Sequence, residues 1–220
     1  MRTEVGAANE RVPTPEDVSL IVTYHRSRPA SSIGPIVVAA AAIAALVLCD
    51  RASAQEGTFL SEAQAPAAVF PDADSFVREV VNVTPELREK MRAVLGATQL
   101  SVWEDQYVTF RALHGGVLIG YAIIVEEIGK HRPITFVVGV QPDDKVNDVA
   151  VMAYREAYGG EVRNKRFLTQ YHGKSSGDAL QPYADIKNIA GATLSVEAAG
   201  RAVKKAMALA RVAFGARGGG

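Results

Sequence analysis

The sequence predicts an α+β domain, because strand-like segments form one block and helices flank it without βαβ alternation. Four β-rich runs follow one another at residues 102–113, 117–128, 134–140 and 146–154. Short turn sequences separate these runs. Such connections favour antiparallel neighbours, since a parallel crossover needs about a dozen residues or more. We therefore expect an antiparallel four-stranded meander sheet with flanking helices, preceded by an N-terminal export or anchor segment.

Two helices are predicted beside this sheet. The first begins at Thr84-Pro85-Glu86, where an N-cap residue precedes a first-turn proline, and it ends at Gly96. Its apolar face is made of Leu87, Met91, Val94 and Leu95. The second helix spans residues 196–214 and carries a stripe of small apolar side chains: Val196, Ala199, Val203, Ala206, Ala210 and Ala213. Both helices are expected to pack on the sheet.

The N-terminal part of the chain has the pattern of a signal peptide. Residues 33–49 are an uninterrupted run of apolar and small residues, with Arg26 and Arg28 before it and an Ala-x-Ala site ending at Ala54 after it. A spanning helix needs about 20 apolar residues, so a cleavable signal is favoured over a retained membrane anchor, which stays open. Either reading predicts a protein exported to the periplasm or to the extracytoplasmic face of the cytoplasmic membrane.

Composition divides the rest of the chain. Residues 1–32 show no apolar period and are expected to be disordered or untranslated, and residues 33–54 are the signal peptide or anchor. Residues 55–74 are rich in Ala, Gly, Pro and acidic side chains, which is typical of a linker. The folded domain is expected to cover residues 75–215.

Charge and cysteine content exclude several classes of function. Lys plus Arg and Asp plus Glu both number 24, so no basic surface points to a nucleic-acid partner. Cys49 is the one cysteine of the sequence and the histidines lack paired ligand spacing, so neither a metal site nor an iron–sulfur cluster is expected. Any redox chemistry would need a cofactor held in some other way.

Small residues precede the second predicted helix, in the order Asn-Ile-Ala-Gly-Ala-Thr-Leu-Ser over residues 188–195. Small side chains let the backbone approach a ligand closely, and a helix N-terminus offers free N–H groups and a positive dipole end. The pattern suits a phosphate. An ordinary loop with Ser195 as the helix N-cap explains it as well, and the residues alone leave both readings open.

Gly191-Ala192-Thr193-Leu194-Ser195 resembles the Ser-Gly-Ala-Thr-x-Ser/Thr motif of the FMN-binding domain found in the G subunit of the Rnf complex and the C subunit of the sodium-pumping NADH:quinone reductase. Further blocks resemble the family in the same order, at residues 120–122, 129–136, 154–163 and 167–174. The resemblance implies FMN whose phosphate is esterified to Thr193 by a separate flavin transferase that uses FAD.

The resemblance also implies which other residues surround the cofactor. It places Gly191, Ala192, Leu194 and Ser195 around the phosphate. Lys130 and His131 are expected near the flavin or its phosphate, although a solvated turn explains them equally well. The turn with Tyr154, Glu156, Gly159 and Gly160 is expected against the isoalloxazine ring, where Glu156 or a backbone amide would bond the ring edge. A salt-bridged strand end is the structural alternative.

Two positions depart from the motif. Lys187 and Ala190 stand where the usual target of the transferase has an acidic residue and a hydroxyl, and Asp185 lies nearby at a different spacing. We expect an exported electron-transfer module rather than a self-contained enzyme, with the flavin transferase and redox proteins at the membrane as partners. The alternatives are a membrane-anchored flavin subunit of an ion-pumping redox complex, and a binding or regulatory module that has lost covalent flavin.

Overall fold

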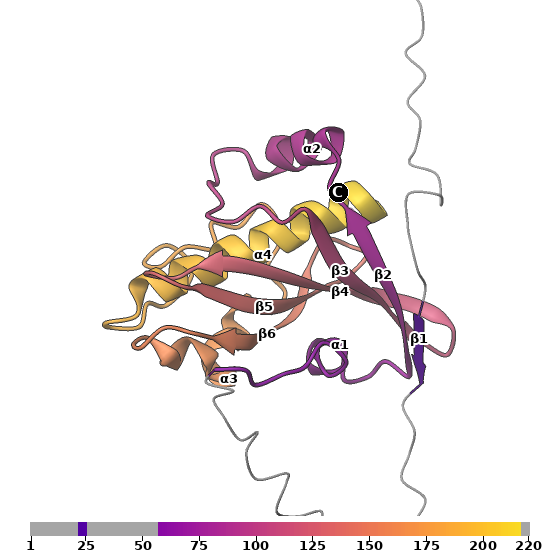
Figure 1. Cartoon of the computed structure of the whole chain (residues 1–220), viewed down its shortest axis with the longest axis horizontal. Coiled ribbons are helices and arrows are strands. Elements are labelled where there is room, and N and C mark those ends of the chain that lie inside the picture. The colour runs from indigo at the N-terminus through magenta and orange to yellow at the C-terminus, as the bar shows by residue number, and fades with distance from the viewer. Residues whose placement is uncertain (1–21, 26–56, 217–220) are drawn as a thin grey trace, which may run out of the picture.

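The computed structural model describes residues 22–25 and 57–216, and it is an α+β fold built on one antiparallel sheet (Figure 1). Six strands lie in the order β1-β2-β3-β4-β5-β6, so each strand pairs with its neighbour in sequence. Their bounds are Val22–His25, Ser75–Asn82, Gln106–His114, Val117–Ile128, Pro133–Val140 and Val146–Tyr154. The antiparallel meander is confirmed, whereas the predicted number of four strands is wrong.

The two additional strands lie at the edge of the sheet beside β3. Strand β2 pairs with β3 along its whole length, and β1 pairs with β2. Strand β2 lacks a clean apolar alternation because it carries Glu79, which is buried and pairs with Arg111 of β3 at 2.6 Å. Strand β1 falls inside residues 1–32, which we expected to be disordered or untranslated. Its backbone instead extends the sheet.

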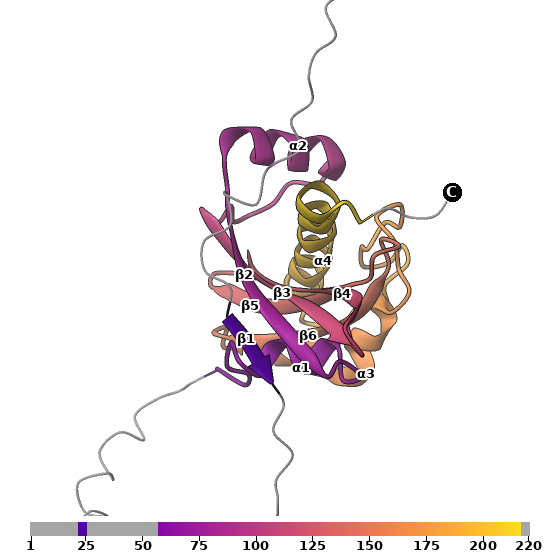
Figure 2. The same cartoon turned by 90° about the vertical axis from the view of Figure 1, so that its right-hand side faces the viewer.

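Helices cover both faces of the sheet, as Figures 1 and 2 show. On one face lie α2, Pro85–Leu95, and the long α4, Thr193–Phe214; on the other lies the short α1, Ala65–Val69. Helix α2 begins and ends as predicted, with the Thr84 hydroxyl accepting from the Leu87 N–H and Gly96 at its C-terminus. Past β6 the chain forms η2, Gly160–Arg163, α3, Lys165–Leu168, and η3, Thr169–Tyr171, before it reaches α4.

Residues 57–74, which the sequence predicts as a linker, are part of the folded unit. Thr58 bridges to Ala153 at the outer edge of β6. Val69 and Phe70 are buried on the sheet face opposite α4, in a cluster with Phe110 and Val137. Composition concealed this packing, because α1 is a short Ala- and Pro-rich helix without an amphipathic period. The described domain therefore starts near residue 57 rather than 75.

Buried charges join α4 to the sheet. Lys205 is fully buried, and its Nζ lies 2.8 Å from Glu127 Oε1 and 3.0 Å from Glu104 Oε2. Arg201 Nε lies 3.0 Å from the second Glu127 oxygen, and its Nη2 donates to the Ile128 carbonyl. A buried charge needs partners of this kind, because desolvation alone would be too costly. These contacts fix α4 against the end of β4.

The predicted export segment at residues 33–49 lies outside the described residues, so its structure stays a prediction.

Candidate functional site

Helix α4 begins at Thr193, three residues before the predicted start. Val196 is the first residue whose N–H bonds back into the helix, to the Ala192 carbonyl at 3.0 Å. The N–H groups of residues 193–195 have no acceptor within the helix, as is normal for a first turn. Gly191 precedes them with a φ of 80°, and nothing lies within 4 Å of the position a Cβ would take there. This terminus is open to an anion.

The hydroxyl of Thr193 is held by a side chain that sequence reasoning did not single out. Asn188 Nδ2 donates to Thr193 Oγ1 at 2.8 Å and to the Tyr183 hydroxyl at 2.6 Å. Asn188 Oδ1 is buried and has no partner among the described residues. The partly exposed Thr193 oxygen is therefore oriented, and a free hydrogen-bond acceptor lies beside it. An amide five residues before the threonine was the available sequence signal.

Ser195 lies two residues after Thr193 and belongs to the first turn of α4 rather than being its N-cap. Its hydroxyl lies 3.0 Å from the Tyr154 hydroxyl, which donates to the Tyr158 carbonyl. Burial raises the pKa of Tyr154 and outweighs the opposing hydrogen bond from Ser195, so the phenol stays protonated at neutral pH. Tyr154 therefore links the end of β6 to the start of α4.

Gly159 allows this close approach. Its φ is 84°, and a Cβ there would lie 2.8 Å from the Tyr154 hydroxyl and 2.9 Å from Ser195 Oγ. Ala192 Cβ would be 3.3 Å away. Gly160 follows at the start of η2, where its carbonyl accepts from Arg163 Nε. The structure thus brings Tyr154, Gly159, Ala192 and Ser195 together.

Glu156 is committed to the turn between β4 and β5. Its Oε1 accepts from the N–H groups of His131 at 2.5 Å and Arg132 at 2.9 Å. Burial raises the pKa of Glu156, but the backbone N–H groups of Arg132, His131 and Lys130 together outweigh it and hold the pKa below its ordinary value. The side chains of Lys130 and His131 are exposed in this turn. Glu156 therefore positions the turn through Oε1.

The Asp185 carboxylate contacts Lys174 and the backbone of Gln181. It accepts from Lys174 Nζ at 3.0 Å and from the Gln181 N–H at 3.1 Å. The hydrogen bond to Asp185 raises the pKa of Lys174 above its ordinary value. The pair closes the loop at residues 181–186. Lys187 and Ala190 are both exposed, as is Leu194 beside Thr193.

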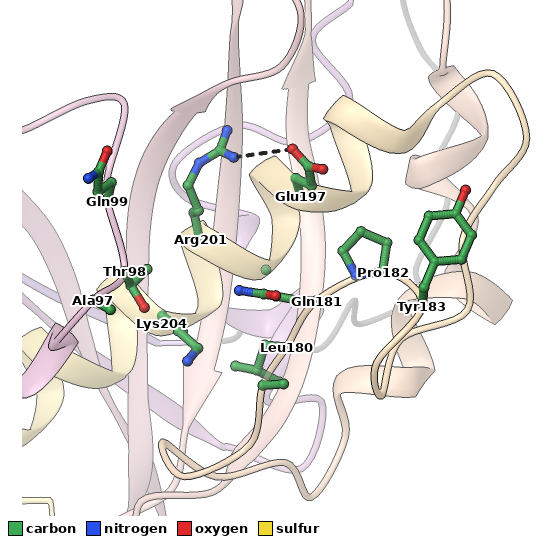
Figure 3. Close-up of a pocket in the computed structure, with 12 residues that line it drawn as sticks. Ala97, Thr98, Gln99, Leu180, Gln181, Pro182, Tyr183, Glu197, Arg201 and Lys204 are labelled. Atoms are coloured by element: carbon green, nitrogen blue, oxygen red, sulfur yellow. Dashed lines mark ion pairs between the residues drawn. The ribbon is translucent and has the colours of Figure 1, made fainter.

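A cavity of about 340 Å³ lies along α4 (Figure 3). Residues 97–99 and 179–183 form its sides, and Glu197, Gly200, Arg201 and Lys204 of α4 line its floor. Glu197 is four residues after Thr193, so both lie on one face of the helix. The 179–183 loop rests directly on α4, because a Cβ at Gly200 would lie 2.0 Å from the Leu180 carbonyl oxygen. Sequence reasoning missed this cavity, since it joins segments far apart in the chain.

Residues 129–208 match the family model of the FMN-binding domain. Over residues 129–208, the chain is assigned to the FMN-binding domain family. The match runs from the turn between β4 and β5 through most of α4, so it includes every residue predicted for the site. No curated protein matches the chain.

Two features are absent from residues 22–25 and 57–216. No helix there is long and apolar enough to cross a membrane. In the same part of the chain, no three His, Cys, Asp or Glu side chains gather in a way that could hold a metal ion.

Proposed function

We propose that this domain carries FMN through a phosphoester bond to Thr193 Oγ1 and serves as an exported electron-transfer module. The observation that supports this best is the position of Thr193, at the open start of α4 with its hydroxyl oriented by Asn188. The family match supports FMN itself. When bound, FMN supplies the redox chemistry, and the protein sets its position and surroundings.

The residues at the start of α4 fit the phosphate end of FMN. The free N–H groups of residues 193–195 point along the helix axis, where hydrogen bonds and the helix dipole both favour an anion. Gly191 leaves room for the phosphate oxygens. Asn188 Oδ1 is an unused acceptor next to Thr193, and a hydroxyl of the ribityl chain could donate to it. The helix N–H groups would thus donate to the phosphate, and Asn188 Oδ1 would accept from the ribityl chain.

Attachment would use Thr193 as the nucleophile. Its Oγ1 gives up a proton and bonds to the phosphorus of the FMN half of FAD, while the bond to the AMP half breaks and AMP leaves. Asn188 donates to Oγ1 and so leaves the hydroxyl proton free for a base on the transferase. Lys187 and Ala190 distinguish this target from the usual motif, and they favour loss of covalent flavin as the second candidate.

Export is part of the same proposal. The apolar run at residues 33–49 and the Ala-x-Ala site ending at Ala54 support it. A cofactor that dissociated outside the cytoplasm would be lost, so a covalent bond suits an exported carrier. The flavin transferase and redox proteins at the membrane are the proposed partners. N-terminal sequencing of the protein from its host tests the route: a new terminus at Gln55 supports a free carrier, a retained segment supports a membrane-anchored redox subunit, and a full-length cytoplasmic product contradicts export.

Mass spectrometry tests the attachment. The full chain coexpressed with a flavin transferase should gain the mass of FMN minus water and fluoresce in denaturing gels. Thr193→Ala should abolish both signals, because alanine has no oxygen to form the ester, whereas Thr193→Ser should keep part of them. An unmodified wild type beside an active transferase would contradict the proposal. Restoring Asp at 187 and Ser at 190 would then show whether these two departures are responsible.

A further inference from the structure

We propose that the end of the molecule that carries Thr193 is the docking surface for a redox partner protein whose own surface is acidic. The inference rests on the proposed electron-transfer function and names the chemistry of the partner. Two observations support it. One is the distribution of unpaired charges over the domain, and the other is a group of exposed apolar side chains beside Thr193.

Segments that are separate in the sequence meet at this end: the β4–β5 turn, the residues after β6, α3 with η3, and the loop before α4. Glu156, just after β6, accepts from the backbone N–H groups of His131 and Arg132 in the turn. The Lys187 N–H, in the loop before α4, donates to Gln170 Oε1 in η3. Figure 1 shows α3 and the start of α4 at the same end of the sheet.

Cations without a carboxylate partner gather at this end. Within residues 22–25 and 57–216, no ion pair and no side-chain hydrogen bond engages the charged groups of four exposed residues: Lys130, Arg132, Arg166 and Lys187. Arg163 is also exposed, and its Nε donates to a backbone carbonyl rather than to a carboxylate. Unpaired, exposed cations direct their field into solvent, so this end is positive.

The opposite end of the sheet has the opposite sign. Asp72 and Asp74 are exposed beside the β3–β4 turn, where Asp74 Oδ2 accepts from the Gly115 N–H, and neither forms an ion pair within the part of the chain that the structure describes. The β3–β4 and β4–β5 turns lie at the two ends of β4, a strand of 12 residues, which spans about 40 Å. That distance exceeds the Debye length of about 8 Å at physiological salt, so a partner meets each end separately.

Exposed apolar side chains lie within the positive end. Tyr158 is 86% exposed, Tyr183 80% and Leu194 44%. Leu194 follows Thr193, and the Tyr183 hydroxyl accepts from the same Asn188 amide that holds Thr193. Protein interfaces commonly combine aromatic anchors with a polar, charged rim. The two tyrosines and the leucine supply the apolar contact, and the unpaired cations supply the rim.

The pattern of charges favours a protein over an anionic membrane surface. Glu161 is exposed two residues before Arg163, and Lys165 pairs with Asp148, so carboxylates stand among the cations. A mixed pattern fixes the register of a complementary protein surface, whereas anionic lipids respond to the sum of the cations. Opposite charge raises the rate of encounter by about 10–10³-fold. An acidic partner is thus steered to the end that carries Thr193.

Two small redox probes test this field in the flavinylated full chain. Ferricyanide is an anion and hexaammineruthenium(III) is a cation; two equivalents of either, each taking one electron, reoxidise one fully reduced flavin. The ferricyanide rate should fall as salt is raised, and the hexaammineruthenium(III) rate should rise. Lys130→Gln combined with Arg132→Gln should lower the ferricyanide rate several-fold. Lys90→Gln combined with Lys145→Gln, which also removes two exposed cations, should leave that rate unchanged.

Poly-L-glutamate tests the same surface without flavin, as the probe for an acidic protein. When it is added at low salt to the full chain labelled with ¹⁵N, amide signals should shift at the β4–β5 turn, at Arg166 and at Lys187. Signals around Asp72 and Asp74 should stay in place. The shifts should disappear at high salt, because salt screens the attraction between exposed charges.

Three results would overturn the inference. One is a ferricyanide rate that ignores both salt and the loss of Lys130 and Arg132 in protein with a full FMN mass increase, which leaves the attachment intact. Another is poly-L-glutamate shifts that scatter over the whole surface. The third is binding to phosphatidylglycerol vesicles through Lys130 and Arg132 without any binding of poly-L-glutamate. If the wild type gains no FMN mass, the attachment proposal fails instead, and the poly-L-glutamate titration decides the docking surface.

Discussion

Single residues set how closely the chain segments approach each other at the start of α4. Gly159 has a positive φ and lies where a Cβ would meet both the Tyr154 hydroxyl and Ser195 Oγ. Gly173 has a similar φ of 72°, but nothing lies within 4 Å of its Cβ position. A comparison of substitutions at the two glycines therefore distinguishes the cost of backbone strain from the cost of overpacking.

Replacing Gly159 should cost more than replacing Gly173. Backbone strain from a side chain at positive φ costs about 1–2 kcal/mol in either variant. Gly159→Ala should lose roughly a further 1–3 kcal/mol, because the methyl group overpacks against Tyr154 and Ser195. Urea unfolding of both variants measures the difference. Equal losses would mean that the Tyr154 to Ser195 contact relaxes without cost.

At the scale of secondary-structure elements, the segment before β2 completes the second face of the sheet. Phe70 follows α1 and lies over two strand glycines, since Cβ atoms at Gly120 and Gly139 would lie 2.3 and 3.1 Å from its ring. Phe59 belongs to the same segment but is 47% exposed, with the Arg163 guanidinium 4.4 Å from its ring centre. One phenylalanine is core and the other is surface.

Phe70→Ala should destabilise the domain strongly, while Phe59→Ala should not. Loss of a fully buried phenylalanine costs about 3–5 kcal/mol, which is a large part of the stability of a typical domain. Loss of Phe59 should cost about 1 kcal/mol or less, the size of an exposed cation–π contact. Thermal and urea unfolding of the two variants measure the two losses of stability.

A fragment that starts at residue 75 should likewise be much less stable than one that starts at residue 57. Equal stability of the two fragments would show that α1 is dispensable.

At the scale of the whole molecule, local sequence patterns predicted the strands and helices whose formation depends mainly on residues close to each other in the chain. The period of β4 to β6 and the start of α2 at Thr84 were visible without any partner. Strand β2 was not, because Glu79 breaks its apolar pattern and its partner Arg111 lies on another strand. The site divides in the same way. The motif indicated Thr193, whereas the cavity against residues 97–99 exists only through tertiary contacts.

The buried charges that join α4 to the sheet give a test of the whole assembly. Lys205 and Glu127 are both fully buried, so removing one of them leaves the other charge with too few partners. Lys205→Met should cost about 3–5 kcal/mol, and Glu127→Gln a similar amount, although Arg201 softens the loss of Lys205 by staying near Glu127. Both positions lie deep between helix and sheet.

The double variant should cost clearly less than the sum of the two single variants, because it removes both charges together. The difference is the coupling energy of the pair, and contacting charges typically give about 0.5–3 kcal/mol in such a cycle. Urea unfolding of the wild type and the three variants supplies the four values. The matched cycle uses Lys145 and Asp143, an exposed pair at 3.0 Å that should show a coupling of about 1 kcal/mol or less. Purely additive losses at Lys205 and Glu127 would show that this ion pair contributes no coupling of its own between α4 and the sheet.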